Sequence, residues 1–171
     1  MAAFIRAGAI LPFCLARRGV VLGAASPEAS VPLSLLSAPW SVAEIEFEKE
    51  IKTHRGPRVT SFPGYVMRLP EAIGRKLNLK QNLYAISRIC PHEGCQMNFY
   101  KERSEISMPL PIQEFANPML VCPCHQSVFD LAQGGKVLIG PAPRPPWTFD
   151  FVVQKGRVII KDLEPGGEKW G

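Results

Sequence analysis

Hydrophobic and polar residues alternate in several short stretches of the chain from Ser41 onward. In VAEIEF (42–47), apolar residues alternate with glutamates, which is typical of a strand with one buried face. Further strands are predicted at GYVMRL (64–69), NLYAIS (82–87), MLVC (119–122), KVLIG (136–140), WTFDFVV (147–153) and RVIIKDL (157–163). Short strands at short intervals, with few helices, predict a small all-β domain.

The segments between these strands predict turns and loops. PEAIGRKLNLKQ (70–81) has room for one or two helical turns, and QKG (154–156) predicts a hairpin between the last two strands. The chain has 17 prolines, mostly in its second half, which favours loops over long helices. The Pro-rich segment 100–118 predicts a long functional or mobile loop, and the tail 164–171 is expected to be loose.

The composition narrows the class of protein only slightly. The chain has 171 residues, of which 46% are hydrophobic and 20% charged, as in an ordinary globular domain with a short extra segment. The net charge of +5 is partly N-terminal, because the first 27 residues contain three arginines and no acidic residue. No basic cluster interleaved with aromatic side chains is present, so the sequence argues against nucleic-acid binding.

The N-terminal segment suggests export or membrane attachment. Its apolar runs, 7–16 and 19–25, are separated by Arg17 and Arg18. Each run is shorter than the roughly 20 apolar residues of a membrane-spanning helix. The stretch ARRGVVLGAAS loosely resembles a twin-arginine export signal, which predicts translocation of the folded protein. Cys14 follows the bulky Phe13, which is unsuitable for lipid attachment, so we interpret it as an incidental apolar cysteine.

Cysteines and histidines concentrate in two short Pro-containing stretches, CPHEGC (90–95) and CPCH (122–125). Thiolates favour iron–sulfur clusters, copper or zinc, and imidazole suits zinc, copper or iron. A zinc finger would usually take its cysteines from one half of the motif and its histidines from the other. A disulfide scaffold alone would leave the histidines unexplained. A [2Fe–2S] cluster with two cysteines on one iron and two histidines on the other fits both stretches, and leaves one cysteine in each for a bridge.

The stretches CPHEGC, CPCHQSVFD and GPAPRPP closely resemble the Rieske iron–sulfur proteins of cytochrome bc1 and b6f complexes. The resemblance covers about residues 83–146 in detail. It implies a Rieske fold, a small antiparallel β-sandwich with an inserted two-loop cluster-binding subdomain. It also implies one Rieske-type [2Fe–2S] cluster as the cofactor.

The resemblance also implies a role for each residue of the motifs. Cys90 and Cys122 would ligate the buried iron, while His92 and His125 would ligate the outer iron and act as the catalytic histidines. The implied disulfide joins Cys95 and Cys124. The segment 140–143 would form a third wall of the cluster site.

Three neighbours are expected to tune the site. Ser127 matches a family serine that donates a hydrogen bond to a bridging sulfide of the cluster. Phe129 stands where many high-potential members have a tyrosine, so it lacks a hydroxyl donor that would raise the potential. Glu93 stands where the family commonly has leucine. Its carboxylate would favour the oxidised cluster, disturb an apolar docking surface and bear on the choice of partner.

The leading hypothesis for function, from this resemblance, is the electron-transfer subunit of a quinol-oxidising cytochrome bc-type complex, an oxidoreductase. Its implied partners are quinol, a cytochrome b-type subunit and a c-type cytochrome. One alternative is the small Rieske subunit of a molybdenum-type oxidase such as arsenite oxidase, which Glu93 and the missing spanning helix would favour. Another is a soluble Rieske ferredoxin, although those usually lack the bridging cysteines. A small disulfide-bonded binding module would leave His92 and His125 unexplained.

These inferences predict a chain of two units. Residues 1–39 would form a targeting or membrane-associated segment with a hinge, for which 35–43 is the candidate, and residues 40–171 would form the Rieske domain. The cluster-binding subdomain would span about residues 88–146. The expected location is the cell membrane, with the head domain on the outer or periplasmic side.

Overall fold

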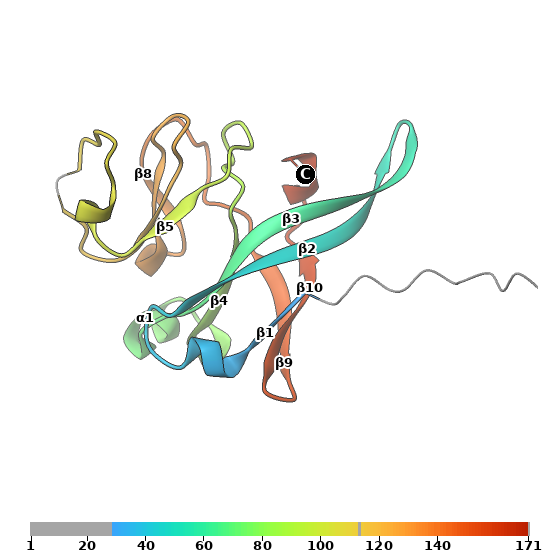
Figure 1. Ribbon diagram of the computed structural model, residues 1–171, viewed down its shortest axis with the longest axis horizontal. Coiled ribbons are helices and arrows are strands. Elements are labelled where there is room, and N and C mark those ends of the chain that lie inside the picture. Colours follow the sequence, from blue (N-terminus) through green and yellow to red (C-terminus); the bar gives the residue numbers. More distant parts are fainter. Residues whose placement is uncertain (1–28, 113, 171) are drawn as a thin grey trace, which may run out of the picture.

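The computed structural model describes residues 29–112 and 114–170, and the regular secondary structure of this part is mostly antiparallel strand (Figure 1). Within it, only α1 (Glu71–Lys76) is an α-helix. The strands are β1 (Ser30–Pro32), β2 (Val42–Thr53), β3 (Gly56–Arg68), β4 (Leu83–Ser87), β5 (Asn98–Tyr100), β6 (Met119–Val121), β7 (Val128–Asp130), β8 (Lys136–Ile139), β9 (Phe149–Gln154) and β10 (Arg157–Leu163). The short 3-10 helices are η1 (Leu33–Leu36), η2 (Lys80–Asn82), η3 (Arg103–Glu105), η4 (Leu131–Gln133) and η5 (Gly167–Trp170).

Two three-stranded sheets, in the orders β1-β10-β9 and β2-β3-β4, enclose the first hydrophobic core. The alternation predicted for 42–47 is present: Ile45 is buried, while Glu44 and Glu46 on either side are exposed. Burial of one face of each sheet is what stabilises such a sandwich. The buried side chains of this core include Val31, Leu36, Ile45, Phe62, Val66, Leu83, Val158, Ile160 and Leu163.

A third sheet of four strands, in the order β5-β6-β7-β8, lies in the sequence between β4 and β9. A second hydrophobic core joins it to β3 and β4, so the inserted subdomain is packed onto the sandwich. The buried members of this core include Tyr65, Met67, Ile86, Met97, Leu120, Phe129 and Leu131. The expected fold class, an all-β protein with an antiparallel sandwich and an inserted subdomain, is therefore confirmed.

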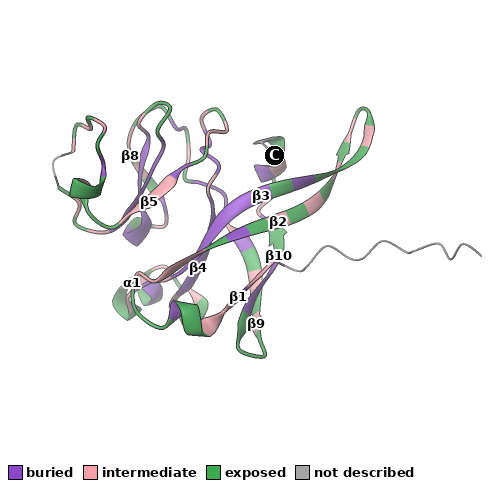
Figure 2. Cartoon of the chain, in the orientation of Figure 1, coloured by how far each residue is buried: buried purple, intermediate pink, exposed green. Residues whose placement is uncertain are grey.

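The hairpin of β2 and β3 is much longer than the two strands predicted at 42–47 and 64–69. Its register runs from Val42 opposite Met67 to Thr53 opposite Gly56, so a two-residue turn joins the strands. Its far end projects beyond the rest of the molecule (Figure 1) and its tip is largely exposed (Figure 2). The predicted hairpin at 154–156 is confirmed, because Arg157 pairs with Gln154.

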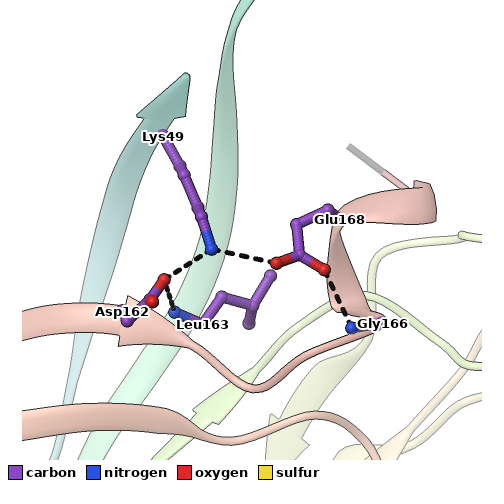
Figure 3. Close-up of polar contacts among 5 residues, drawn as sticks. All are labelled: Lys49, Asp162, Leu163, Gly166 and Glu168. Atoms are coloured by element: carbon purple, nitrogen blue, oxygen red, sulfur yellow. Dashed lines mark hydrogen bonds and ion pairs between the residues drawn. The ribbon is translucent and has the colours of Figure 1, made fainter. Parts of the chain in front are cut away.

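The C-terminal tail is ordered by a lysine, so the prediction of a loose tail at 164–171 was wrong for its described part. The Lys49 ammonium on β2 contacts Asp162 at 2.6 Å and Glu168 at 2.9 Å (Figure 3). The Gly166 amide also donates to Glu168, at 2.8 Å. Hydrogen bonds to Asp162 and then Glu168 raise the pKa of Lys49, and the bonds from Lys49 lower the pKa of both carboxyl groups.

The segment 100–118 packs onto the third sheet. Ile106 is buried in a third hydrophobic cluster with Met119, Val121 and Val128. The Arg103 guanidinium donates to three backbone carbonyls of the same segment: Ile106 at 2.7 Å, Ile112 at 3.0 Å and Met108 at 3.2 Å. One side chain thus satisfies three backbone carbonyls of this segment.

Residues before the predicted domain start at 40 also contribute to the sandwich. Strand β1 pairs with β10, with Val31 opposite Val158, and Leu36 in η1 is fully buried. The division into 1–39 and 40–171 and the hinge at 35–43 stay predictions. The export signal and Cys14 lie outside the described residues. Within the described part, no helix has the length and apolar character needed to cross a membrane.

Candidate metal centre

Two loops carry the predicted ligands and face each other at one end of the third sheet. The first loop, residues 90–95, lies between β4 and β5, and the second loop, residues 122–127, lies between β6 and β7. Cys95 of the first loop and Cys124 of the second form a disulfide, with an S–S distance of 2.00 Å and a Cα–Cα distance of 6.5 Å. This is the pairing that the resemblance implied.

The backbones of the two loops repeat one pattern of hydrogen bonds. In each, the amide of the first residue donates to the carbonyl of the sixth: Cys90 to Cys95 at 2.8 Å, and Cys122 to Ser127 at 2.9 Å. In each, the amide of the fifth residue also donates back to the carbonyl of the first, at 3.0 Å. The two cysteines at the first positions are therefore held alike, at the inner end of each loop.

The fifth residue of each loop has a left-handed backbone. In the first loop it is Gly94, with φ of 77°, and in the second it is Gln126, with φ of 57°. Glycine adopts this conformation without steric cost, whereas glutamine does so at a cost of about 1–2 kcal/mol.

The two predicted thiol ligands are buried together. Cys90 and Cys122 are free cysteines, each 1% exposed, and their thiols are close enough to interact by a hydrogen bond. Burial raises the pKa of the Cys90 thiol to about 11, against the opposing effect of hydrogen bonds from the His92 backbone and the Ser127 hydroxyl. A cationic metal would supply the charge needed to hold these sulfurs as thiolates, since the thiolate is the metal-binding form.

The two predicted imidazole ligands meet at the surface. The Nδ1 atoms of His92 and His125 lie 3.2 Å apart, with the ring planes nearly perpendicular. The side chains of His92 and His125 are 26% and 47% exposed. Two ring nitrogens from separate loops that point at one place are suited to a shared metal. The four donors thus form a buried thiol pair and an exposed imidazole pair, a division that suits two irons with different ligands.

A Pro-containing segment closes the site behind the second loop. The Ala142 amide donates to the Ser127 hydroxyl oxygen at 3.2 Å, and Ser127 is fully buried. Gly140 lies so close that an added Cβ would be 2.5 Å from Ser127 Cα, and its φ of 91° is itself left-handed. Only glycine fits at this contact, which places the predicted 140–143 wall directly against the second loop.

The two departures from the family pattern occupy different environments. The Glu93 carboxylate is 61% exposed and lies between the histidines, 3.9 Å from His92 Nε2 and 3.8 Å from His125 Nδ1. Phe129 is fully buried in the same core as Cys90 and Cys122. The effects of both residues on potential stay predictions.

Arg88 holds the residues that flank the first loop, and sequence reasoning did not predict this role. Its guanidinium donates to the Met97 carbonyl at 3.3 Å and to Glu44 at 2.9 Å, and it lies 4.8 Å from the centre of the Tyr65 ring. It thereby ties the residues flanking the first loop to the β2–β3 hairpin. Nothing in the local sequence around Cys90 indicates this role, because the partners come from three other strands or loops.

The buried thiols, the exposed imidazoles and the bridged loops on an antiparallel β scaffold define an iron–sulfur protein with mixed cysteine and histidine ligation. The profile of the Rieske [2Fe-2S] domain family matches residues 49–155. The chain belongs to this family, and a Rieske-type [2Fe–2S] cluster is its cofactor.

Relatives with known roles cover only part of the chain. It is 36% identical to the cytochrome bc1 complex Rieske iron-sulfur subunit of Streptomyces lividans over 76 residues, which are 43% of this chain and 37% of that protein. It is 30% identical to the corresponding subunit of Corynebacterium glutamicum over 135 residues, which are 72% of this chain and 29% of that protein. The chain thus spans about a third of the length of these curated relatives.

Among solved structures, the chain is similar to the plasma-membrane Rieske protein of Synechocystis PCC 6803, with 25% identity and a TM-score of 0.39. The similarity covers 67% of this chain and 85% of that one.

Proposed function

We propose that Cys90 and Cys122 ligate one iron of the cluster and that His92 and His125 ligate the other. The observation that carries this proposal is the 3.2 Å approach of the two Nδ1 atoms. Two such nitrogens can share at most one proton in a hydrogen bond, whereas a metal can accept both. The burial of both free thiols, one in each of the two loops that carry the histidines, supports the same assignment.

When bound, the cluster supplies one-electron transfer. The protein's own contribution is to hold the ligands and to leave one imidazole nitrogen accessible. With Nδ1 directed at the metal, Nε2 of each histidine remains for an external hydrogen bond, and both rings are partly exposed. The disulfide between the loops and the 140–143 wall limit the access of water to the sulfur side of the site.

We propose further that the chain is the electron-transfer subunit of a quinol-oxidising cytochrome bc-type complex. Nε2 of His92 or His125 would accept a hydrogen bond from the quinol hydroxyl and then hold its proton. The electron would pass on to a c-type cytochrome. The names of the Streptomyces lividans and Corynebacterium glutamicum relatives support this function, as does the partial exposure of both imidazoles.

The same proposal gives the partners and the location. A cytochrome b-type subunit would supply the quinol site, and the complex would lie in the cell membrane with this domain on its outer or periplasmic side. Export in the folded state through a twin-arginine route would allow the cluster to be inserted before translocation.

The test has two stages. Purified full-length protein should contain two irons and two labile sulfides per chain, with the low average g value of a histidine-ligated [2Fe–2S] centre. One zinc per chain without iron would contradict the ligand assignment. Membranes with the intact complex should then catalyse quinol-dependent reduction of a c-type cytochrome. An intact cluster that quinol cannot reduce would overturn the bc-type function alone.

Glu93 supports a second candidate, the small Rieske subunit of a molybdenum-type oxidase. Its exposed carboxylate makes the surface around the two histidines polar. A polar surface suits a fixed contact with a polar partner better than insertion into an apolar quinol pocket. Affinity purification of the tagged protein from its native membranes distinguishes the two. Stoichiometric b-type haem supports the bc-type complex, and stoichiometric molybdenum supports the relay subunit.

A further inference from the structure

A groove of about 520 Å³ lies on the side of the inserted subdomain, against the Pro-containing segment. Its floor is apolar and is built by Leu77 at the end of α1, Val137 of β8, Ala142, Pro143 and Pro145. Leu77, Val137 and Ala142 also belong to the second hydrophobic core, so the floor is the outer surface of a packed core. The prolines are conformationally restricted, so a ligand would meet a preformed surface.

The rim of this Pro-loop groove is cationic. Lys76 and Lys136 are exposed and form no ion pair among the described residues, whereas Arg144 is paired with Glu164 at 2.5 Å. The remaining polar residue of the lining, Gln133, donates its amide to Asp130 at 2.6 Å. The groove therefore combines an apolar floor with two unpaired cations, and none of its lining residues is acidic.

The groove shares a wall with the metal centre. Ala142, on its floor, donates its amide to Ser127 of the second loop at 3.2 Å. The charge beside the histidines is of the opposite sign to that of the groove rim, because the Glu93 carboxylate is exposed between them. A partner that binds here would contact Ala142 and Pro143 of the 140–143 segment, and the two signs of charge would orient it.

We propose that the Pro-loop groove is a docking site for an acidic segment of a protein partner. An apolar side chain of that segment would lie on Leu77 and Val137, with carboxylates against Lys76 and Lys136. A small inorganic anion would pair with the lysines but leave the apolar floor uncovered. The inference adds a docking surface to the proposed function and depends on neither the quinol nor the haem partner.

The test uses the full-length, cluster-loaded protein and fluorescein-labelled peptides in low salt. The probe is a blocked pentapeptide of sequence EELEE, and its binding is followed by fluorescence anisotropy. Charge reversal in K76E/K136E should weaken binding at least tenfold, because both rim charges change sign. The matched control K52E/K101E has the same change in net charge at exposed sites outside the groove, and should bind within twofold of the wild type. The peptide EEAEE should bind at least threefold more weakly than EELEE.

Equal weakening in K76E/K136E and K52E/K101E would overturn the proposal, because it would indicate attraction by net charge alone. Equal affinity for EELEE and EEAEE would also overturn it, as would phosphatidylglycerol vesicles that bind through these lysines when the peptide does not. If K76E/K136E loses its cluster, K76Q/K136Q replaces it, with an expected threefold or greater loss. Iron and sulfide analysis of each sample separates these outcomes from a failure of the cluster assignment.

Discussion

The first and second loops both begin with a buried cysteine and a proline, and both have a left-handed residue at the fifth position. Their residue types differ at every position from the third to the sixth, and the fifth position is Gly94 in one loop and Gln126 in the other. At the third, fourth and sixth positions, the first loop reads His92, Glu93 and Cys95. The second loop reads cysteine, histidine and serine there.

The shared backbone holds the buried cysteine at the first position of each loop in the same way. Each loop supplies one thiol, one imidazole and one half of the disulfide, so neither is a site by itself. The residues that differ between the loops give each loop a separate additional role. Glu93 places a charge at the surface of the first loop, and Ser127 ties the second loop to the 140–143 wall. A repeated frame thus positions the proposed metal ligands, and the exceptions to the repeat are the residues that we expect to tune and support them.

The largest effect expected from breaking the pair of loops is loss of the cluster. His125→Ala removes the second loop's proposed ligand to one iron, and Cys122→Ala removes its proposed ligand to the other. Iron and labile sulfide should therefore fall to nearly zero in both variants. His54→Ala is the matched control, because His54 lies in the turn of the β2–β3 hairpin, away from the loops. A cluster that survives in His125→Ala with its g values unchanged would contradict the assignment.

Replacing Gly140, where the 140–143 wall meets the second loop, should cost more stability than replacing a glycine in a free turn. Gly140→Ala combines a left-handed backbone with a Cβ 2.5 Å from Ser127 Cα, and we expect it to lower the free energy of unfolding by about 2–4 kcal/mol. Gly156→Ala is also left-handed, but its Cβ would meet nothing within 4 Å, so about 1 kcal/mol is expected. Equal costs in thermal or chemical denaturation would show that the contact with Ser127 is unimportant.

Removing the bridge between the loops should leave both ligand pairs in place and loosen them. The disulfide closes a separation of 29 residues, for which constraint of the unfolded chain predicts about 3–4 kcal/mol. The double variant C95S/C124S should therefore unfold at lower denaturant concentration and lose iron faster to a chelator. C14S tests for an effect of cysteine removal alone. Unchanged chelation kinetics in C95S/C124S would refute a role for the bridge in protecting the site.

The charge on the first loop should shift the midpoint potential without affecting stability. Glu93→Gln removes a carboxylate beside the histidines, so reduction becomes easier and the potential should rise by on the order of tens of millivolts. The effect is modest because Glu93 is 61% exposed and solvent screens it. Glu105→Gln, an acid in the segment 100–118, should leave the potential unchanged. Protein-film voltammetry of the three proteins measures the difference, and equal potentials would show that Glu93 has no tuning role.

The smallest effects should come from exchanging the residues at the fifth positions, and they should have opposite signs. Gly94→Ala places a side chain at φ of 77° and should cost about 1 kcal/mol. Gln126→Gly relieves a left-handed glutamine and should stabilise the protein by up to about 1 kcal/mol. Destabilisation in both variants, measured by denaturation, would mean that the Gln126 side chain makes a compensating contribution.

Local patterns were sufficient to predict the ligand loops and many of the strands. Cys90 and His92 are close in sequence, as are Cys122 and His125, so their spacing reveals the chemistry before any tertiary contact is known. The strands with clear alternation, such as β2 near Ile45, were predicted for the same reason. The hairpin 154–156 was signalled by its own turn, in which Lys155 and Gly156 both have positive φ.

Features that depend on distant partners could not be predicted. Arg88 acts through Glu44, Tyr65 and Met97, and the C-terminal tail is held by Lys49. The far half of the β2–β3 hairpin is rich in Glu, Lys and Arg, so no hydrophobic alternation marked it. For Arg88 and the C-terminal tail, the stabilising contacts lie outside the sequence window from which a pattern can be read.

The pairing of β1 with β10 has a consequence for the folding kinetics. Arg157 donates hydrogen bonds to Ser30 across a separation of 127 residues, so one sheet of the sandwich joins nearly the two ends of the described chain. Closing a loop of that length costs about 4 kcal/mol of chain entropy beyond a constant. Topologies with such high contact order fold slowly. On a ribosome, this sheet would form only after β10 has emerged, so the hairpin of β2 and β3 would have to persist without its partner sheet until then.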